Sequence, residues 1–272
     1  MSKVWFITGV SRGFGREWAL AALERGDRVA GTARDLSTLD ELVAKYPETF
    51  LALRLDVTDR AADFAAVRQA ADHFGRLDIV VNNAGYGQFG MIEELTEQEL
   101  RDQLETNVFG AVWVTQAALP ILRAQGSGHI LQVSSIGGIS AFQNLGAYHA
   151  SKWALEGLSQ SLAQEVAPFG IHVTLIEPGG FDTDWAGPSS RHATPNPAYD
   201  GSRAARAAQR SSVRRGDPGA TGQAILAVVD ADEPPLRIFL GEIPLAIATA
   251  DYESRLETWR KWQPISVAAQ GN

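Results

Sequence analysis

The stretch VWFITGVSRGFG, residues 4–15, decides the fold of this chain. Its first four residues, Val4 to Ile7, are all apolar and predict a strand that is buried on both faces, as in a parallel sheet. The glycine run Gly9–Gly15 follows at once and opens a helical segment. In that position glycines let the backbone approach a pyrophosphate, and the N–H groups of the helix N-terminus attract it. The stretch therefore predicts a dinucleotide-binding turn.

The same turn also matches a second motif. Residues Gly9–Gly13 fit the G-x-S-x-G nucleophile elbow of α/β-hydrolases, in which Ser11 would be the nucleophile. An elbow needs an oxyanion-hole loop from an earlier strand, and the eight residues before Gly9 leave no room for one. We therefore interpret Ser11 as a residue of the phosphate loop and keep the hydrolase as the alternative.

Short strands and helices alternate along the rest of the chain, which is typical of a doubly wound, Rossmann-like parallel α/β sheet of about seven strands with helices on both faces. No internal repeat or low-complexity linker interrupts the pattern, so we expect a single domain over residues 1–272. Residues 181–219 depart from it and are interpreted as an irregular substrate lid. The expected strands are Val4–Thr8, Val29–Ala33, Phe50–Leu55, Asp78–Asn82, His129–Val133, Ile171–Glu177 and Leu236–Leu240, and the expected helices include Leu36–Lys45, Ala61–Phe74, Glu97–Ala124 and Ala147–Val166.

Composition excludes several classes of protein. The 272 residues include 24 Lys and Arg against 32 Asp and Glu, a net charge of −8, which does not favour nucleic acid as a partner. Cysteine is absent, and the five histidines lack ligand spacing, so we expect no metal site. The best membrane candidate, Thr106–Leu122, is too short and too polar to span a bilayer. With no secretory signal visible, we expect a cytoplasmic protein.

Polar and glycine-rich segments follow three of the expected strands. They are Asn82–Gly85, Ser134-Ser135 and Pro178–Thr183, and the carboxyl ends of parallel strands are where open α/β sheets bind ligands. Tyr148 and Lys152 lie four residues apart and so share one helix face. A nearby ammonium favours the phenolate, so we expect Lys152 to lower the pKa of Tyr148 from about 10 and let it exchange a proton near neutrality.

Together these segments resemble the short-chain dehydrogenase/reductase family. The resemblance rests on Thr8–Gly15, Asn82–Gly85, Asn107, Ser135 with Tyr148 and Lys152, and Pro178–Thr183, and it is close over about residues 3–185. It implies a nicotinamide-dependent carbonyl reduction or alcohol oxidation. Ser135 would hold the substrate oxygen, Tyr148 would exchange its proton, Lys152 would bind the nicotinamide ribose, and Asn107 would hold a proton-relay water. The cofactor-binding residues that it implies are Gly9, Ser11, Arg12, Gly13, Phe14, Gly15, Arg34, Asp56, Val57, Asn83, Ala84, Gly85, Tyr148, Lys152, Pro178, Gly179 and Thr183.

The choice of nucleotide depends on the end of the second expected strand. An acidic residue there would bind the ribose 2′-hydroxyl of NAD, but this chain has Ala33 followed by Arg34. Arg12 can reach the same place, and two guanidinium groups match the geometry of a 2′-phosphate. Asp35 could weaken that preference by pairing with Arg34. We therefore predict NADP(H).

The substrate is the least determined feature. The candidate walls are apolar and aromatic and predict a hydrophobic ketone or secondary alcohol. The alternative is a catalytically silent NADP-binding regulatory protein, against which the intact set of Ser135, Tyr148 and Lys152 argues. The candidate wall residues are Ile136, Ile139, Phe142 and Leu145, then Tyr86, Phe89 and Met91, and from the lid Trp185 and Tyr199.

Four further features concern surfaces. Arg203, Arg206, Arg210 and Arg214 have helical spacing and form either a solvated helix face or a clamp for an anionic substrate. His149 is expected to point away from Tyr148, off the opposite side of its helix. The two long helices 97–124 and 147–166 predict a homodimer or homotetramer. In the tail after Gly241, Trp259 and Trp262 are expected to be packing or interface anchors.

Overall fold

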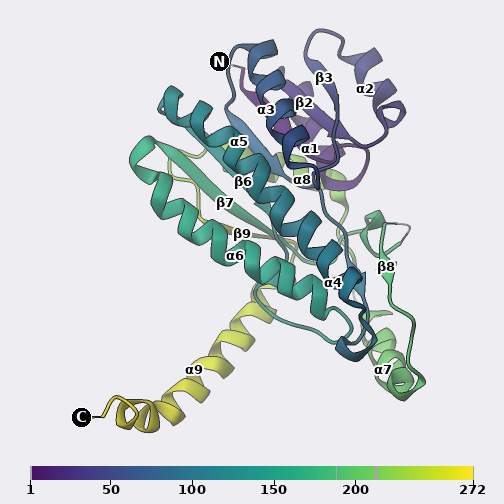
Figure 1. Cartoon of the computed structure of the whole chain (residues 1–272), viewed down its shortest axis with the longest axis vertical. Coiled ribbons are helices and arrows are strands. Elements are labelled where there is room, and N and C mark those ends of the chain that lie inside the picture. Colours follow the sequence, from purple (N-terminus) through teal and green to yellow (C-terminus); the bar gives the residue numbers. More distant parts are fainter. Residues whose placement is uncertain (1, 188, 212–213, 272) are drawn as a thin grey trace.

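A computed structural model describes residues 2–187, 189–211 and 214–271 of the chain, and its centre is one twisted parallel sheet (Figure 1). The strand order is β3-β2-β1-β4-β6-β7-β9, and every neighbouring pair is parallel. The order reverses between β1 and β4, which is where ligands bind in such sheets. The predicted fold class is confirmed. The strands are β1 (Val4–Ile7), β2 (Arg28–Ala33), β3 (Phe50–Arg54), β4 (Ile79–Asn82), β6 (Gly128–Val133), β7 (Ile171–Pro178) and β9 (Arg237–Leu240).

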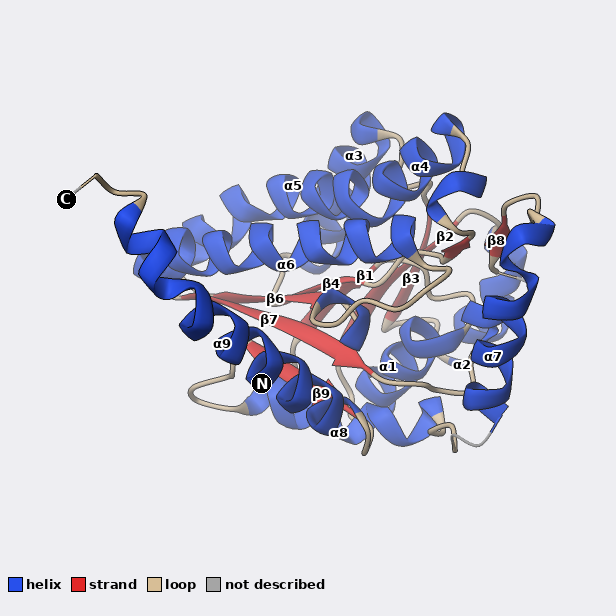
Figure 2. Cartoon of the chain, turned by 90° about the horizontal axis from the view of Figure 1, so that it is seen from below, coloured by secondary structure: helices blue, strands red, loops and turns tan. Residues whose placement is uncertain are grey.

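Helices cover both faces of the sheet (Figure 2). On one face α3, α5 and α6 bury a core with Phe6, Val80 and Ile130, and on the other α1, α2 and α8 bury a core with Trp5 and Ile7. The buried residues of α3 recur at intervals of three or four, as an amphipathic helix requires. The helices are α1 (Gly13–Glu24), α2 (Asp40–Lys45), α3 (Arg60–Phe74), α4 (Glu97–Leu104), α5 (Gly110–Gln125), α6 (Gly146–Val166), α7 (Asp200–Ser211), α8 (Thr221–Asp230) and α9 (Pro244–Ala268).

Several boundaries differ from the sequence prediction. The helix expected over residues 97–124 contains a π-helical turn, Glu105–Phe109, which separates α4 from α5. The segment expected as one helix over residues 36–45 begins with a 3₁₀ turn, Leu36–Leu39, which the Asp35 carboxylate caps by accepting from Ser37 N. Helix α8 was missed, as was a small parallel ladder of β5 (Gln88–Phe89) with β8 (Arg191–His192).

The lid is more regular than predicted, since residues 200–211 form helix α7. Arg203 on this helix forms ion pairs with Glu94 of the body at 2.5 Å and with Asp200 at 2.8 Å. The Arg206 guanidinium lies 5.5 Å from the centroid of the Phe142 ring. Arg214 is exposed, and the side chain of Arg210 lies outside the described residues. The contacts of Arg203 and Arg206 therefore fasten the lid to the body.

Candidate active site

A cavity of about 810 Å³ opens at the carboxyl edge of the sheet, beside the point where the strand order reverses. Its walls come from the segments that follow β1, β2, β3, β4, β6 and β7, together with α6. Most of the site residues predicted from the sequence line it. They are Gly9, Ser11, Arg12, Gly13, Phe14, Arg34, Asp56, Val57, Asn83, Ala84, Gly85, Ser135, Tyr148, Lys152, Pro178, Gly179, Thr183 and Trp185.

The glycine turn is held against the loop after β4. The Asn83 Nδ2 donates to the carbonyl oxygens of Thr8 at 2.8 Å and Gly9 at 2.9 Å. In return, the Thr8 hydroxyl accepts from the backbone N–H groups of Asn83 and Ala84, both at 3.0 Å. Gly15 lies behind this junction, where a Cβ would collide with the Gly9 carbonyl and come within 2.5 Å of the Asn83 amide nitrogen. The tight packing explains why Gly15 shapes the turn without lining the cavity.

The N-terminus of α1 faces this cavity with its backbone donors uncapped by a side chain. Arg12 occupies the cap position with an extended backbone, and its side chain does not cap the helix. Its guanidinium instead lies 3.7 Å from the carboxylate of Asp184, which joins the turn to the lid. Arg34 lines the cavity at the end of β2, while the carboxylate of Asp35 is engaged in its own turn. The first N–H groups of α1 and these two arginines form an anion-binding end of the cavity.

Three of the four predicted catalytic residues meet at the other end. The Tyr148 phenol is hydrogen-bonded to the Ser135 hydroxyl, and Ser135 also accepts from Gly137 N at 3.0 Å. The Lys152 ammonium donates to the carbonyl of Val133 at 2.7 Å and lies 5.7 Å from the centroid of the Tyr148 ring. Both side chains are nearly buried, at 6% and 7% exposure. A hydroxyl, a phenol and an ammonium therefore converge on one cavity wall.

Known proteins resemble this chain in both sequence and structure. The family model described as short chain dehydrogenase matches residues 3–194. The chain belongs to this family. An oxidoreductase of Botryotinia fuckeliana is 42% identical to this dehydrogenase, and the match covers 99% of this chain and 100% of the relative's length. A solved short-chain dehydrogenase of Streptomyces avermitilis is 42% identical, with a TM-score of 0.92 over 98% of each chain. An alcohol dehydrogenase from Thermococcus sibiricus, solved with 5-hydroxy-NADP, is 26% identical with a TM-score of 0.74 over 88% of this chain and 96% of its own.

The acidity of the Tyr148 phenol in this dehydrogenase differs from the sequence prediction, which was wrong in direction. Burial raises the pKa of Tyr148 to about 12, although the hydrogen bond with Ser135 lowers it in part. The same burial lowers the pKa of Lys152 to about 8, against the attraction of Glu156. The prediction considered only the charge of Lys152. Removal of both groups from water has the larger effect, because each neutral form tolerates a low dielectric better than its ion does.

Asn107 and His149 lie behind the cavity wall of this dehydrogenase. Asn107 is in the π-helical turn, where its amide donates to Tyr86 O at 3.0 Å and Ser151 Oγ at 3.1 Å and accepts from Tyr86 N at 3.1 Å. It thus joins the loop after β4 to helix α6. His149 is buried, its ring hydrogen-bonded to Gly137 O at 2.8 Å and Phe142 N at 2.9 Å. The prediction that His149 points off the opposite side of the helix from Tyr148 was wrong, because the two ring centroids lie 5.9 Å apart and the His149 ring holds the loop that follows Ser135.

The end of the cavity beside Tyr148 is more polar than the predicted apolar walls. The Trp185 ring covers Tyr148, with their centroids 4.8 Å apart, and Tyr86 lies beneath the guanidinium of Arg191 at 4.5 Å. Arg191 also pairs with Asp102 at 3.0 Å. These polar residues carried no motif that sequence reasoning could use. Further cavity residues that were missed include Glu105, Thr106, Ser189 and Ser190.

Of the nine predicted wall residues, only Tyr86 and Trp185 line the cavity, so the prediction was wrong for Ile136, Ile139, Phe142, Leu145, Phe89, Met91 and Tyr199. Ile136 and Phe142 pack with Ala248 of α9 in a separate apolar cluster, and Leu145 packs beneath Trp185. None of these three side chains forms part of the cavity surface. Ile136 and Phe142 serve as packing because α9, about a hundred residues later in the chain, covers the loop after β6.

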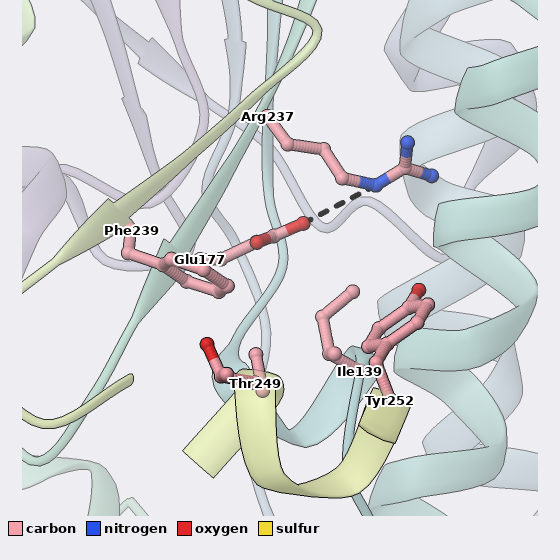
Figure 3. A pocket seen from close by; sticks show the side chains of 7 residues that line it. Ile139, Glu177, Arg237, Phe239, Thr249 and Tyr252 are labelled. Atoms are coloured by element: carbon pink, nitrogen blue, oxygen red, sulfur yellow. Dashed lines mark ion pairs between the residues drawn. The ribbon is translucent and has the colours of Figure 1, made fainter. Parts of the chain in front are cut away.

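A second cavity, of about 380 Å³, lies beneath the base of α9 (Figure 3). Its walls include Ile139, Phe239 and Tyr252, and the buried carboxyl of Glu177 faces the Arg237 guanidinium at 3.4 Å. Arg237 also donates to Glu156 at 2.9 Å. Burial, followed by the repulsion of Glu156, raises the pKa of Glu177 to about 8. Two carboxyl groups, one from α6 and one from β7, thus share Arg237 of β9.

Two kinds of feature are absent from the part of the chain that the structure describes. No cluster of three or more His, Asp or Glu side chains there has the arrangement of a metal site. Nor does any described helix combine the length and the apolar character that a membrane crossing requires.

Proposed function

We propose that this dehydrogenase uses NADP(H) to transfer a hydride between the nicotinamide and a hydrophobic ketone or secondary alcohol. The observation that carries the proposal is that Ser135, Tyr148 and Lys152 line the same cavity as the glycine turn. A phosphate-binding turn alone would fit many nucleotide proteins. A phenol, a hydroxyl and an ammonium on the wall of that cavity fit a proton transfer next to the nucleotide.

The residues of the cavity fit a dinucleotide with a 2′-phosphate. The N–H groups of α1 would hold the pyrophosphate, and Arg12 and Arg34 would hold the 2′-phosphate. Asp56 and Val57 would bind the adenine, and Thr183 would anchor the carboxamide of the nicotinamide. When bound, the nicotinamide ring would supply or accept the hydride.

The protein's own residues would manage the proton. Ser135 would hold the substrate oxygen by a hydrogen bond, and Tyr148 would donate its phenolic proton to that oxygen. With a pKa near 12, the phenol is protonated at neutral pH, which is the form that reduction of a carbonyl requires. Lys152 carries its charge below about pH 8 and would stabilise the phenolate that forms. Asn107 would act as a positioning residue, since it ties helix α6 to the loop after β4.

The cavity walls suggest the kind of substrate, and the exposed helix surfaces suggest the assembly. Trp185 and Tyr86 offer aromatic surface beside Tyr148, which suits an apolar substrate body with a single carbonyl. We propose that the sheet and its lid work as one domain over residues 1–272. We also propose that the chain forms a homo-oligomer, since the family resemblance implies pairing through α5 and α6. Phe109, directly before α5, and Leu158, on α6, are exposed at 43% and 46%.

The test measures nucleotide binding and turnover separately. NADPH and NADH are titrated by fluorescence, and oxidation of the reduced nucleotide is followed over a panel of hydrophobic ketones. We expect tighter binding of NADPH, and turnover that falls by about 10²–10⁴-fold in Tyr148→Phe while NADPH binding is retained.

The matched control removes a phenol elsewhere. Tyr46 packs at the edge of the core near β3, so Tyr46→Phe should keep both binding and turnover. Binding of NADPH without turnover of any ketone or alcohol would favour the silent regulatory protein instead. Failure to bind either nucleotide would contradict the proposal and return Ser11 to consideration as a nucleophile.

A further inference from the structure

The last helix of the chain leaves the body. Helix α9 has 25 residues, a length of about 37 Å, and carries the C-terminus away from the sheet (Figures 1 and 2). Only its first three turns are anchored. Ala248 is buried, Asp251 accepts from the Ser140 hydroxyl at 2.9 Å, and Arg255 donates to the Ile139 carbonyl at 2.9 Å. Every described residue after Arg255 is exposed.

The exposed part, residues 256–268, is poorly suited to stand alone in water. A helix of this length is marginal by itself even in alanine-rich sequences. This one contains Pro264 and the β-branched Ile265 and Val267, which weaken a helix further. It also exposes Trp259 and Trp262 at 58% and 56%. A helix of this composition needs a surface to pack against.

Four of the exposed apolar residues of α9 lie along one face. Leu245, Tyr252, Leu256 and Trp259 are separated by seven, four and three residues, which places them in a single stripe. Here they are called the arm stripe, and each is at least 40% exposed. At this helical spacing Glu253 and Arg260, seven residues apart, both lie on one flank of the stripe. Such a flank is self-complementary in charge when two copies of the helix run antiparallel.

We propose that α9 is a dimerisation arm, whose stripe packs antiparallel against the arm stripe of a second copy of this chain. The two-fold axis passes between Leu256 and Glu257. Glu253 of each copy then faces Arg260 of the other, forming two equivalent ion pairs beside the apolar contact. An antiparallel pair of this kind is closed by its symmetry and stops at two arms.

Charge favours a second copy over a membrane surface. Between residues 251 and 261 the arm carries three acidic and three basic side chains, so its polar face has no net charge. A helix that lies on anionic lipid is rich in Lys and Arg on its polar face. The alternation of sign in this arm suits a partner of the same sequence.

The cavity beneath α9 fits the same arrangement. Thr249 and Tyr252 of α9 form one wall of it, and Phe239 and Ala248 add apolar surface (Figure 3). The register that joins Glu253 to Arg260 sets Trp262 of the second copy level with Asp251, at the edge of this wall. Large aromatic side chains seated at a pocket dominate the binding energy of most interfaces. Trp262 is therefore the expected anchor of the arm.

The test measures molar mass by light scattering on the full-length protein and its variants. We expect Glu253→Arg to halve the mass, because it places two guanidinium groups together at each ion pair. The double variant Glu253→Arg with Arg260→Glu should restore the wild-type mass, since it exchanges the signs. Trp262→Ala should weaken self-association at least tenfold. The matched control Glu233→Arg makes the same change of charge in an exposed loop outside the arm and should keep the wild-type mass.

Four results would overturn the proposal. They are a monomeric wild type, an unchanged mass for Glu253→Arg, a double variant that stays at half mass, or a monomer whose arm binds phosphatidylglycerol vesicles. Binding of NADPH by each variant confirms that the body remains folded. If α5 and α6 also pair, the wild type is a tetramer and Glu253→Arg is a dimer, so the halving of mass is expected in either case.

Discussion

One cavity of this dehydrogenase lies at the carboxyl edge of the sheet and the other beneath the base of α9, and both bury ionisable groups. In the larger cavity the buried groups have partners, since Lys152 donates to Val133 and Tyr148 bonds Ser135. In the smaller one, Glu177 and Glu156 share the single guanidinium of Arg237, and neither oxygen of Glu177 makes a well-aligned hydrogen bond to it. Only the larger cavity also has backbone donors and a glycine turn at its other end. A shifted pKa therefore does not distinguish an active site, whereas convergence of a binding turn with satisfied catalytic groups does.

The largest expected effect concerns the smaller cavity and the stability of the fold. The pKa of Glu177 is raised from 4.5 to about 8, so the folded state binds a proton more tightly than the unfolded state between these pH values. The free energy of unfolding should therefore fall as pH rises from 4.5 to 8, by about 1.4 kcal/mol for each pH unit and on the order of a few kcal/mol in total. Glu177→Gln should flatten this slope, as measured by urea unfolding at several pH values.

A control separates this effect from a general change of charge. Glu242 is exposed just before α9, and Glu242→Gln should keep the wild-type slope. If Glu177→Gln also keeps the wild-type slope, Glu177 is already ionised in the folded state and its pKa is not raised by burial.

The second effect concerns the larger cavity and the packing of its glycine turn. Gly15→Ala forces a methyl group against the Gly9 carbonyl and the Asn83 amide, which should cost about 1–3 kcal/mol of stability and weaken NADPH binding. Thermal unfolding and nucleotide titration measure the two losses. In contrast, Gly157 on α6 has open space around it, and Gly157→Ala should stabilise the chain by about 0.5–1 kcal/mol. Equal effects at the two positions would contradict the close packing of the turn.

A smaller effect should distinguish the two nucleotides. Arg34 lines the larger cavity at the end of β2, and Arg34→Ala should weaken NADPH binding about tenfold, or ~1.4 kcal/mol, and leave NADH binding unchanged. Arg54, exposed at the end of the neighbouring β3, serves as the control and should affect neither nucleotide. Equal losses for NADPH and NADH would show that Arg34 binds a group that the two nucleotides share.

The larger cavity could be predicted from sequence and the smaller one could not. The glycine turn, Ser135, Tyr148 and Lys152 follow strands or share one helix turn, so local spacing was enough to bring them together. The direction of the Tyr148 pKa was not predictable in this way, because burial depends on Trp185 and other residues far along the chain. For the same reason Ile136 and Phe142 were assigned to substrate, although α9 covers them. Glu177 and Arg237 come from separate strands, and no motif joins them.

The smallest expected effect links the two cavities. Glu156 lies one helical turn after Lys152 on α6, so it can act on the ammonium in the larger cavity while it accepts from Arg237 beside the smaller one. Its negative charge raises the pKa of Lys152, in opposition to burial. Glu156→Gln should therefore lower the pKa of Lys152 further below 8, by less than about one pH unit because Arg237 already neutralises part of the charge.

The chain contains only four lysines, so each side chain can be followed by NMR after labelling of the lysine ε-carbon. Lys152→Arg assigns the signal, and its titration in wild type and Glu156→Gln gives the change in pKa directly. If the enzyme depends on a charged Lys152, the alkaline limb of its rate profile should move to lower pH by the same amount. A rate profile that moves while the Lys152 signal does not would place the dependence on another group. Unchanged titration of Lys152 would show that the two cavities are electrostatically independent, although Glu156 accepts from Arg237 beside the smaller one.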